Sequence, residues 1–251
     1  MVGWAGVLTG GCATAGVLAW GAYHPASTLF GQTIRHTSSD RTIALTFDDG
    51  PNPVLTPRLL DLLDRHQARA TFFLVGRWAS AHPSIVKEIQ ARGHTIGNHT
   101  TTHPNLVFLK KRRIVSELAR CQTIIEDIVG VRPSLVRPPF GARGPQFPAA
   151  VRESGLTHVV MWTLMGRDWN RRGKQRLAAR LARVRGGDVV VLHDGSFEKL
   201  GADREETLRS LEYWLPRWGE AGLACVGLEQ DAEKGILNAK RKNAKRRKKG
   251  K

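Results

Sequence analysis

The stretch TIALTFDDGP, Thr42 to Pro51, joins a run of strand-forming residues to two adjacent aspartates and a Gly-Pro turn. β-branched and aromatic residues favour a strand, so we expect a strand at 42–47 and a loop at 48–53. Successive strand side chains point to opposite faces, so Asp48 and Asp49 can share one site only if the strand ends or twists there. The stretch therefore predicts a strand that carries carboxylates at its carboxyl end.

Strand and helix patterns alternate along the rest of the chain. Further strands are expected at 70–75, 95–98, 135–137, 157–161, 188–192 and 223–228, with helices at 56–67, 78–91, 110–129, 175–184 and 204–221. Alternation at this spacing indicates βα units and a mainly parallel sheet. About seven strands fit a barrel better than an open sheet. We expect an α/β fold, an irregular (β/α)7-type barrel spanning residues 41–229.

The N-terminal segment is apolar from Val2 to Tyr23, and the first charged side chain is Arg35. Its length matches the roughly 20 residues of a membrane-spanning helix. We therefore expect a transmembrane anchor helix at 1–24 and a connector at 25–40. A cleaved signal and a buried core helix are the alternatives, and the missing basic flank leaves the topology open.

Composition indicates a globular, basic protein. The apolar fraction is 41% and the net charge is +17, and nine basic residues with no acid lie in Lys240–Lys251. We expect a disordered basic tail at 230–251 that binds an anionic envelope polymer or lipid headgroups, with a solubilising tail as the alternative. Nucleic acid is disfavoured because no aromatic residue is interleaved for base stacking. Three cysteines without a CxxC pair exclude a disulfide scaffold, and a Cys121–Cys225 bridge stays open.

Reactive side chains follow five predicted strands, where barrels of this kind carry their active face. The five segments are Thr46–Gly50, His99–His103, Arg137–Gly141, Arg167–Trp169 and Leu192–Asp194. Each alone has an ordinary explanation, such as aspartates that form a turn. The spacing of the two histidines would place both imidazoles on one face of a helix.

Together, the five segments contain the parts of a hydrolase. Two histidines and a carboxylate form a zinc set that leaves positions open for water and substrate. A second carboxylate can serve as general base, and a separate histidine can protonate the leaving group. An arginine and another aspartate remain to position the base and the acid. This combination predicts hydrolysis of an amide or an ester.

In this order, the segments TFDDG, HTTTH, RPPFG, DW and LHDG resemble the signature motifs of the polysaccharide deacetylase family. This is the NodB-homology domain, grouped among the carbohydrate esterases. The resemblance runs from Arg41 to Leu228. TFDDG and HTTTH at their mutual distance are its most specific parts.

The resemblance implies a metal centre and a base. Asp49, His99 and His103 would bind a divalent metal, with Zn²⁺ as the first choice. Asp48 would be the general base that deprotonates the attacking water. The backbone N–H of Phe140 would help to hold the developing oxyanion.

The resemblance also implies an acid and a pocket for the acetyl group. His193 would donate a proton to the departing amine, and Asp168 would keep His193 protonated. Arg137 would orient the general base. Trp169 and Leu192 would line the pocket that takes the acetyl methyl group.

The implied function is metal-dependent removal of N-acetyl groups from a GlcNAc-containing glycan. Peptidoglycan and chitin-like oligomers are the favoured substrates. Phe140 stands where the family often has Tyr, and Met165 where it often has Asp, but neither belongs to the metal set. An O-acetyl esterase acting on acetylated polysaccharide is the alternative within the enzyme class. A catalytically silent glycan-binding protein is the alternative outside it, and the intact set of acids and histidines argues against it. With the anchor, we expect a membrane-attached protein whose catalytic domain lies outside the cytoplasm.

Overall fold

The structure, a computed structural model, describes residues 16–229 and 231. Most of the predicted anchor and almost all of the predicted basic tail lie outside these residues. Residues 16–23 are helical. No helix in the described part of the chain is both long and apolar enough to cross a membrane. The domain boundaries at 24, 40 and 229 stay predictions.

A curled parallel sheet forms the centre of the molecule. Its strands are β1 (Thr42–Gly50), β2 (Ala70–Leu74), β3 (Thr95–Asn98), β4 (Leu135–Val136), β5 (His158–Val159), β6 (Leu164–Met165), β7 (Val189–His193) and β8 (Ala224–Cys225). They run in the order β5-β4-β3-β2-β1-β7-β6, and β8 pairs with the start of β1. All these pairings are parallel. The predicted α/β class is confirmed, as an open barrel in which β5 and β6, the ends of the strand order, do not pair with each other.

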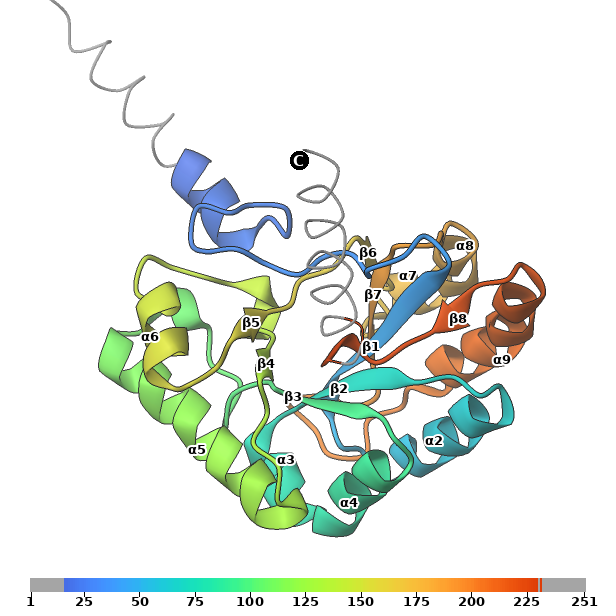
Figure 1. Cartoon of the computed structure of the whole chain (residues 1–251), viewed down its shortest axis with the longest axis horizontal. Coiled ribbons are helices and arrows are strands. Elements are labelled where there is room, and N and C mark those ends of the chain that lie inside the picture. The colour runs from blue at the N-terminus through green and yellow to red at the C-terminus, as the bar shows by residue number, and fades with distance from the viewer. Residues whose placement is uncertain (1–15, 230, 232–251) are drawn as a thin grey trace, which may run out of the picture.

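Helices cover the outside of this sheet, in an arc that runs from α6 through α5 and α4 to α9 and α8 (Figure 1). They are α2 (Thr56–Arg65), α3 (Gly76–Ala81), α4 (Pro83–Ala91), α5 (Lys111–Val129), α6 (Phe147–Glu153), α7 (Arg171–Lys174), α8 (Leu177–Leu181) and α9 (Glu205–Glu220). The prediction of a single helix at 78–91 is wrong, because the structure has two helices, α3 and α4, in this region. The helical segment is split at His82 because Pro83 cannot continue the hydrogen-bond ladder of a preceding helix.

Side-chain alternation along β1 separates the core from the barrel interior. Ile43, Leu45 and Phe47 are fully buried in the apolar cluster formed with the covering helices. Thr46 and Asp48 alternate with these residues along the strand, so their side chains lie on its other face. The strand's outer face therefore stabilises the fold, and its inner face is free to carry polar groups.

The cysteines of the described chain contribute no cross-link. Cys121 and Cys225 are both free. Burial raises the pKa of each thiol to about 12. The Cys121–Cys225 bridge left open by the sequence is therefore absent.

Candidate active site

The end of β1 turns both aspartates toward the barrel interior. The pairing of β1 with β2 is irregular between Asp48 and Gly50, and Asp49 adopts a left-handed φ of 71°. A bulge of this kind re-aims a side chain at the end of a strand. The strand therefore extends to Gly50, beyond the predicted 42–47, and the twist required for two adjacent carboxylates to share a site is present.

Glycines let the ends of β1 and β7 approach each other. A Cβ on Gly50 would meet the carboxylate of Asp194, and a Cβ on Gly195 would meet the backbone of Asp49. Any larger residue at either position would push the two strand ends apart. The glycines of the TFDDG and LHDG segments thus allow Asp49, the candidate metal ligand, and His193, the candidate acid, to share one site.

Asp49, His99 and His103 form a candidate metal centre. Asp49 Oδ1 lies 3.6 Å from Nε2 of His99 and 3.2 Å from Nε2 of His103, and one ligand atom from each residue falls within 4.8 Å of the others. All three side chains are buried, and in the described structure Asp49 Oδ1 has no hydrogen-bond partner. A buried carboxylate oxygen facing two imidazole nitrogens is the donor set that Zn²⁺ prefers. The residues present fit a divalent metal.

The protonation states agree with this assignment. Burial lowers the pKa of His99 to about 4, so its imidazole is neutral at pH 7. Its Nδ1 lies 2.7 Å from the carbonyl oxygen of Arg137. A carbonyl can only accept, so Nδ1 carries the proton and Nε2 keeps its lone pair. Burial opposes the charge of Asp49, but the nearby imidazoles hold the pKa of that carboxyl well below its usual range.

The two histidines lie on a loop, and the expectation of a shared helix face is wrong. Thr100 and His103 have left-handed φ values of 66° and 62°. The Asn98 side chain accepts the N–H of Thr100 at 2.8 Å, and the Thr100 hydroxyl accepts that of His103 at 3.0 Å. Short polar side chains that capture backbone N–H groups in this way compete with helix formation. A spacing of four residues is compatible with a tight loop as well as with a helical turn.

Glu117 of α5 holds this loop in place. Its carboxylate accepts the backbone N–H of Thr102 at 2.9 Å and the Thr102 hydroxyl at 3.0 Å. Its backbone carbonyl accepts the hydroxyl of Thr101 at 2.8 Å. The buried glutamate thus connects the longest helix of the fold to the histidine loop.

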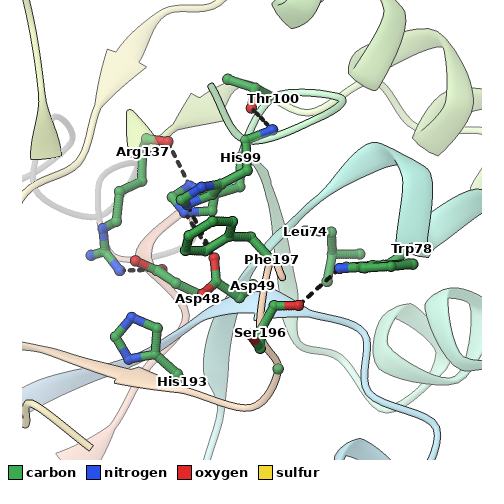
Figure 2. A network of polar contacts seen from close by, with 12 residues as sticks. Asp48, Asp49, Leu74, Trp78, His99, Thr100, Arg137, His193, Ser196 and Phe197 are labelled. Atoms are coloured by element: carbon green, nitrogen blue, oxygen red, sulfur yellow. Dashed lines mark hydrogen bonds and ion pairs between the residues drawn. The ribbon is translucent and has the colours of Figure 1, made fainter. Parts of the chain in front are cut away.

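Arg137 binds the second aspartate. Its Nη1 donates to Asp48 Oδ1 at 2.7 Å and lies 2.6 Å from the Thr46 hydroxyl, and the guanidinium is fully buried (Figure 2). A charge-assisted hydrogen bond of this length fixes the position of the Asp48 carboxyl group. Asp48 is therefore held as an acceptor beside the candidate metal centre.

His193 faces the same site, on the side of the two carboxylates away from His99 (Figure 2). Its Nδ1 lies 2.8 Å from Asp168 Oδ1, and its backbone N–H donates to Asp168 Oδ2 at 2.8 Å. Burial opposes the charged imidazole, but the adjacent Asp168 carboxylate outweighs it and raises the pKa of His193 to about 9. Trp169 packs edge-on against the ring at 5.0 Å. His193 is thus held protonated at neutral pH.

These groups meet in one cavity of about 460 Å³. Asp48, Asp49 and the three histidines line it, together with Phe140 and Trp169. Arg137 and Asp168 lie behind this lining, each bonded to a residue that reaches the cavity. Of the ten residues nominated from sequence, nine therefore lie in the site or contact it.

The assignment of Leu192 to the pocket wall is wrong. Its side chain is fully buried in the apolar core, and the neighbouring Val191 lines the cavity instead. Alternation along β7 places Val191 and His193 on the inner face and Leu192 on the outer one. Met165 also contributes to the wall.

Sequence reasoning missed Phe197, which covers the candidate metal centre. Its ring stacks on His103 with centroids 4.1 Å apart and an interplanar angle of 12°. The loop that carries it is tied to α3, because Trp78 Nε1 donates to the Ser196 carbonyl at 3.0 Å (Figure 2). The loop follows directly after β7, so the rule that pointed to His193 could also have pointed to Phe197.

Comparisons with known proteins agree with this site. The family model described as polysaccharide deacetylase matches residues 35–159. A chitooligosaccharide deacetylase of Bradyrhizobium sp. (strain ANU 289) is 35% identical over 201 residues, 77% of this chain and 91% of that protein. A peptidoglycan-N-acetylglucosamine deacetylase of Bacillus cereus is 33% identical over 195 residues, 77% of this chain and 89% of that protein.

The solved structure of the peptidoglycan deacetylase PdaC from Bacillus subtilis matches with a TM-score of 0.71 at 29% identity, covering 83% of this chain and 97% of that one. The similarity in sequence thus extends over about nine tenths of the two named relatives, and the similarity in fold over nearly all of the solved PdaC chain. The chain belongs to the polysaccharide deacetylase family.

Proposed function

We propose that this protein is a metal-dependent hydrolase that removes N-acetyl groups from a GlcNAc-containing glycan. One observation carries the proposal: Asp48 and a protonated His193 line one cavity around a buried Asp-His-His set. A base and an acid beside a metal-binding set are the components that amide hydrolysis needs. The glycan class rests on the names of the chitooligosaccharide and peptidoglycan deacetylases that the chain resembles.

Asp49, His99 and His103 would hold the divalent ion, and zinc is our first choice. When bound, such an ion supplies Lewis-acid polarisation of the acetyl carbonyl and of the attacking water. The neutral imidazole of His99 and the ionised carboxylate of Asp49 are both ready to donate lone pairs. The site therefore does not have to release protons from these two groups before it binds a cation.

The chain's own residues perform the proton transfers. Asp48, oriented by Arg137, takes a proton from water as the water oxygen bonds to the acetyl carbon. The backbone N–H of Phe140 would donate to the carbonyl oxygen as negative charge develops there. His193 gives its proton to the sugar nitrogen as the carbon–nitrogen bond breaks. The products are acetate and a free amine.

The ester alternative differs in its leaving group. An amine leaves only when its nitrogen is protonated, whereas a sugar alkoxide is a better leaving group. Substituting His193 by Gln is therefore expected to reduce N-deacetylation more than removal of an O-acetyl group. Equal losses on both substrates would contradict the role of His193 as the group that protonates the departing amine.

The test is acetate release from a GlcNAc oligomer by chelator-treated protein, with and without added zinc, beside an Asp48→Asn variant. Zinc-dependent release that Asp48→Asn abolishes supports the proposal. Release from O-acetylated xylan alone would support the esterase. Zinc bound at one equivalent per chain without release from any acetylated glycan would support the silent binder. Failure to bind a divalent metal would contradict the metal centre.

We also propose that the N-terminal segment attaches the protein to a membrane with the catalytic domain outside the cytoplasm. In support, the helical residues 16–23 expose Val17, Leu18 and Trp20, each at least half accessible to solvent. Removing residues 2–15 is expected to shift the protein from the membrane fraction to the supernatant. An unchanged distribution would contradict the anchor.

A further inference from the structure

A second cavity, of about 500 Å³, lies beside β6. Its charged lining consists of Arg167, Arg180, Arg183, Arg185 and a single carboxylate, Asp188. We call this cavity the arginine groove. Four guanidinium groups and one carboxylate give it a clear excess of positive charge, and none of these residues has a part in the hydrolysis described above.

The arginines have little to neutralise them within the protein. In residues 16–229, Arg167, Arg183 and Arg185 make no ion pair, and Arg180 Nη1 donates to the carbonyls of Gly166 and Gly173 at 3.1 and 3.0 Å. Asp188 accepts the backbone N–H of Arg185 at 2.8 Å. Like charges that share a cavity repel each other, so an anion in the groove would be stabilised. Guanidinium groups suit carboxylate and phosphate because they donate paired hydrogen bonds.

The groove adjoins the catalytic cavity. Met165 of β6 lines both of them. Arg167 is followed directly by Asp168 and Trp169, which act on and beside His193. Arg183 and Arg185 precede β7, whose opposite end carries His193, so the groove runs away from the acid along a strand of about 16 Å. A polymer whose acetylated sugar occupies the catalytic cavity can therefore present a group a few sugars away to these arginines.

We infer that the arginine groove binds an anionic group, a carboxylate or a phosphate, carried by the glycan substrate within a few sugars of the one that is deacetylated. The inference rests on the proposed function and narrows its substrate class to acidic, N-acetylated glycans. The shared wall at Met165 favours the glycan over a separate anionic molecule, because one polymer can fill both cavities.

The test compares two glycans and two matched variants. The substrates are an uncharged GlcNAc oligomer and a polymer in which GlcNAc alternates with a uronic acid. Arg183→Ala/Arg185→Ala removes two exposed arginines of the groove. Arg112→Ala/Arg120→Ala removes two exposed arginines of α5, across the barrel from α8, and changes the net charge equally (Figure 1).

The groove variant is expected to lose about tenfold in kcat/KM on the acidic polymer, mainly through KM, since charge-assisted hydrogen bonds to the substrate are removed. Its activity on the uncharged oligomer should stay within about twofold, because no group that contacts the acetyl site has changed. The α5 variant should resemble the wild type on both. Equal losses in both variants, or no loss in the groove variant, would overturn the inference.

Two further measurements separate this inference from the proposed function. If neither glycan releases acetate, the proposed function fails, and calorimetric binding of the acidic polymer tests the groove directly. Binding lost only in the groove variant supports the groove, and unchanged binding overturns it. Vesicles containing an anionic phospholipid form the last arm. Vesicle binding that needs the arginines, with unchanged glycan kinetics, would assign the groove to lipid and overturn the inference.

Discussion

At the scale of single residues, the hydrogen bond between His193 Nδ1 and Asp168 Oδ1, 2.8 Å long, sets the charge of the proposed acid. Asp168 is fully buried, and the Thr207 hydroxyl donates to its Oδ2 at 2.8 Å. Burial opposes ionisation of Asp168, but the His193 imidazole outweighs it and holds the pKa of the carboxyl below its usual range. The carboxylate therefore stays charged and keeps the imidazole protonated.

Replacing Asp168 by Asn should move the alkaline limb of the kcat/KM profile to lower pH. His193 must be protonated to donate, and its pKa of about 9 keeps it so at neutral pH. Without the Asp168 carboxylate, burial is opposed by Asp49 and Asp48 but no longer by the group that raises the pKa most, so the pKa of His193 falls and the proton is lost earlier. The measurement is kcat/KM against pH, with Thr207→Val as the control that leaves the carboxylate charge in place. An unmoved limb would contradict the assignment of His193 as the acid.

The pair of His193 and Asp168 also makes the free energy of unfolding depend on pH, in a direction that follows from the pKa of His193. The pKa of His193 is raised from 6.5 to about 9 in the folded protein. Its contribution to the free energy of unfolding is therefore fully present below pH 6.5 and is lost as the pH rises through about 9. Asp168→Asn should flatten this part of the stability profile, measured by urea unfolding across that pH range.

Replacing Phe197 by Ala should weaken metal binding. His103 Nδ1 is buried and, within the described structure, has no hydrogen-bond partner to orient its ring. Phe197 stacks on that ring at 4.1 Å and takes the place of such a partner. We expect zinc affinity to fall by roughly tenfold, the low end of the effect of losing a ligand-orienting group. Competition with a chromogenic chelator measures it, and Phe197→Tyr, which keeps the ring, should bind zinc normally. Wild-type affinity in Phe197→Ala would show that stacking does not orient His103.

At the scale of elements, α5 supports the histidine loop that follows β3. Glu117 is buried and faces Thr101 and Thr102 from the middle of this helix. Asn98 Nδ2 adds a hydrogen bond of 2.8 Å to the carbonyl of Leu118. A helix outside the barrel thus determines the shape of a loop inside it.

Substituting Glu117 by Ala should therefore reduce both stability and metal affinity. The backbone N–H and the hydroxyl of Thr102 lose their acceptor, and because these hydrogen bonds are only partly buried, their loss costs roughly 1 kcal/mol. Urea unfolding of the metal-free protein and a zinc titration measure the two effects. Glu117→Gln retains an acceptor for that N–H and should lie between Ala and the wild type. Unfolding that changes while zinc affinity does not would limit Glu117 to a structural role.

At the scale of the whole molecule, Arg143 joins the N-terminal segment to the barrel. Its guanidinium, fully buried, donates to the carbonyls of His24 and Ser27 at 2.9 and 3.1 Å. Its backbone N–H donates to the carbonyl of Ala22 at 3.0 Å. The end of the predicted anchor and the start of the connector are therefore part of the packed body of the protein.

A chain lacking residues 2–24 should be less stable than one lacking only residues 2–15. The longer deletion removes two of the three acceptors of Arg143, and each buried donor left unpaired costs roughly 1–3 kcal/mol. Urea unfolding of the two chains measures the difference. In an Arg143→Met background the difference should shrink, because the guanidinium that donates to His24 is gone in both chains and only the backbone N–H of residue 143 still loses an acceptor. An equal difference in both backgrounds would show that Arg143 is not the connection.

The sequence by itself determined the alternation of strands and helices and the residue types that form the site. Residues just after parallel strands meet at one edge of a sheet wherever the exact strand ends fall. For that reason Asp48, Asp49, His99, His103 and His193 could be brought together from their positions along the chain. The long helix predicted at 110–129 ends at Val129 as expected, where Gly130 follows with a left-handed φ of 72°.

The tertiary structure alone decided which side chains reach the cavity and how they are held. Val191 replaces Leu192 in the wall because the face of a strand residue depends on the register of its pairing. The loop conformation of His99–His103 depends on Glu117, and the cover over His103 depends on Trp78 holding the Phe197 loop. The arginine groove likewise gathers residues of β6 and α8. These features are contacts between residues distant in the chain, and local propensity carries no information about them.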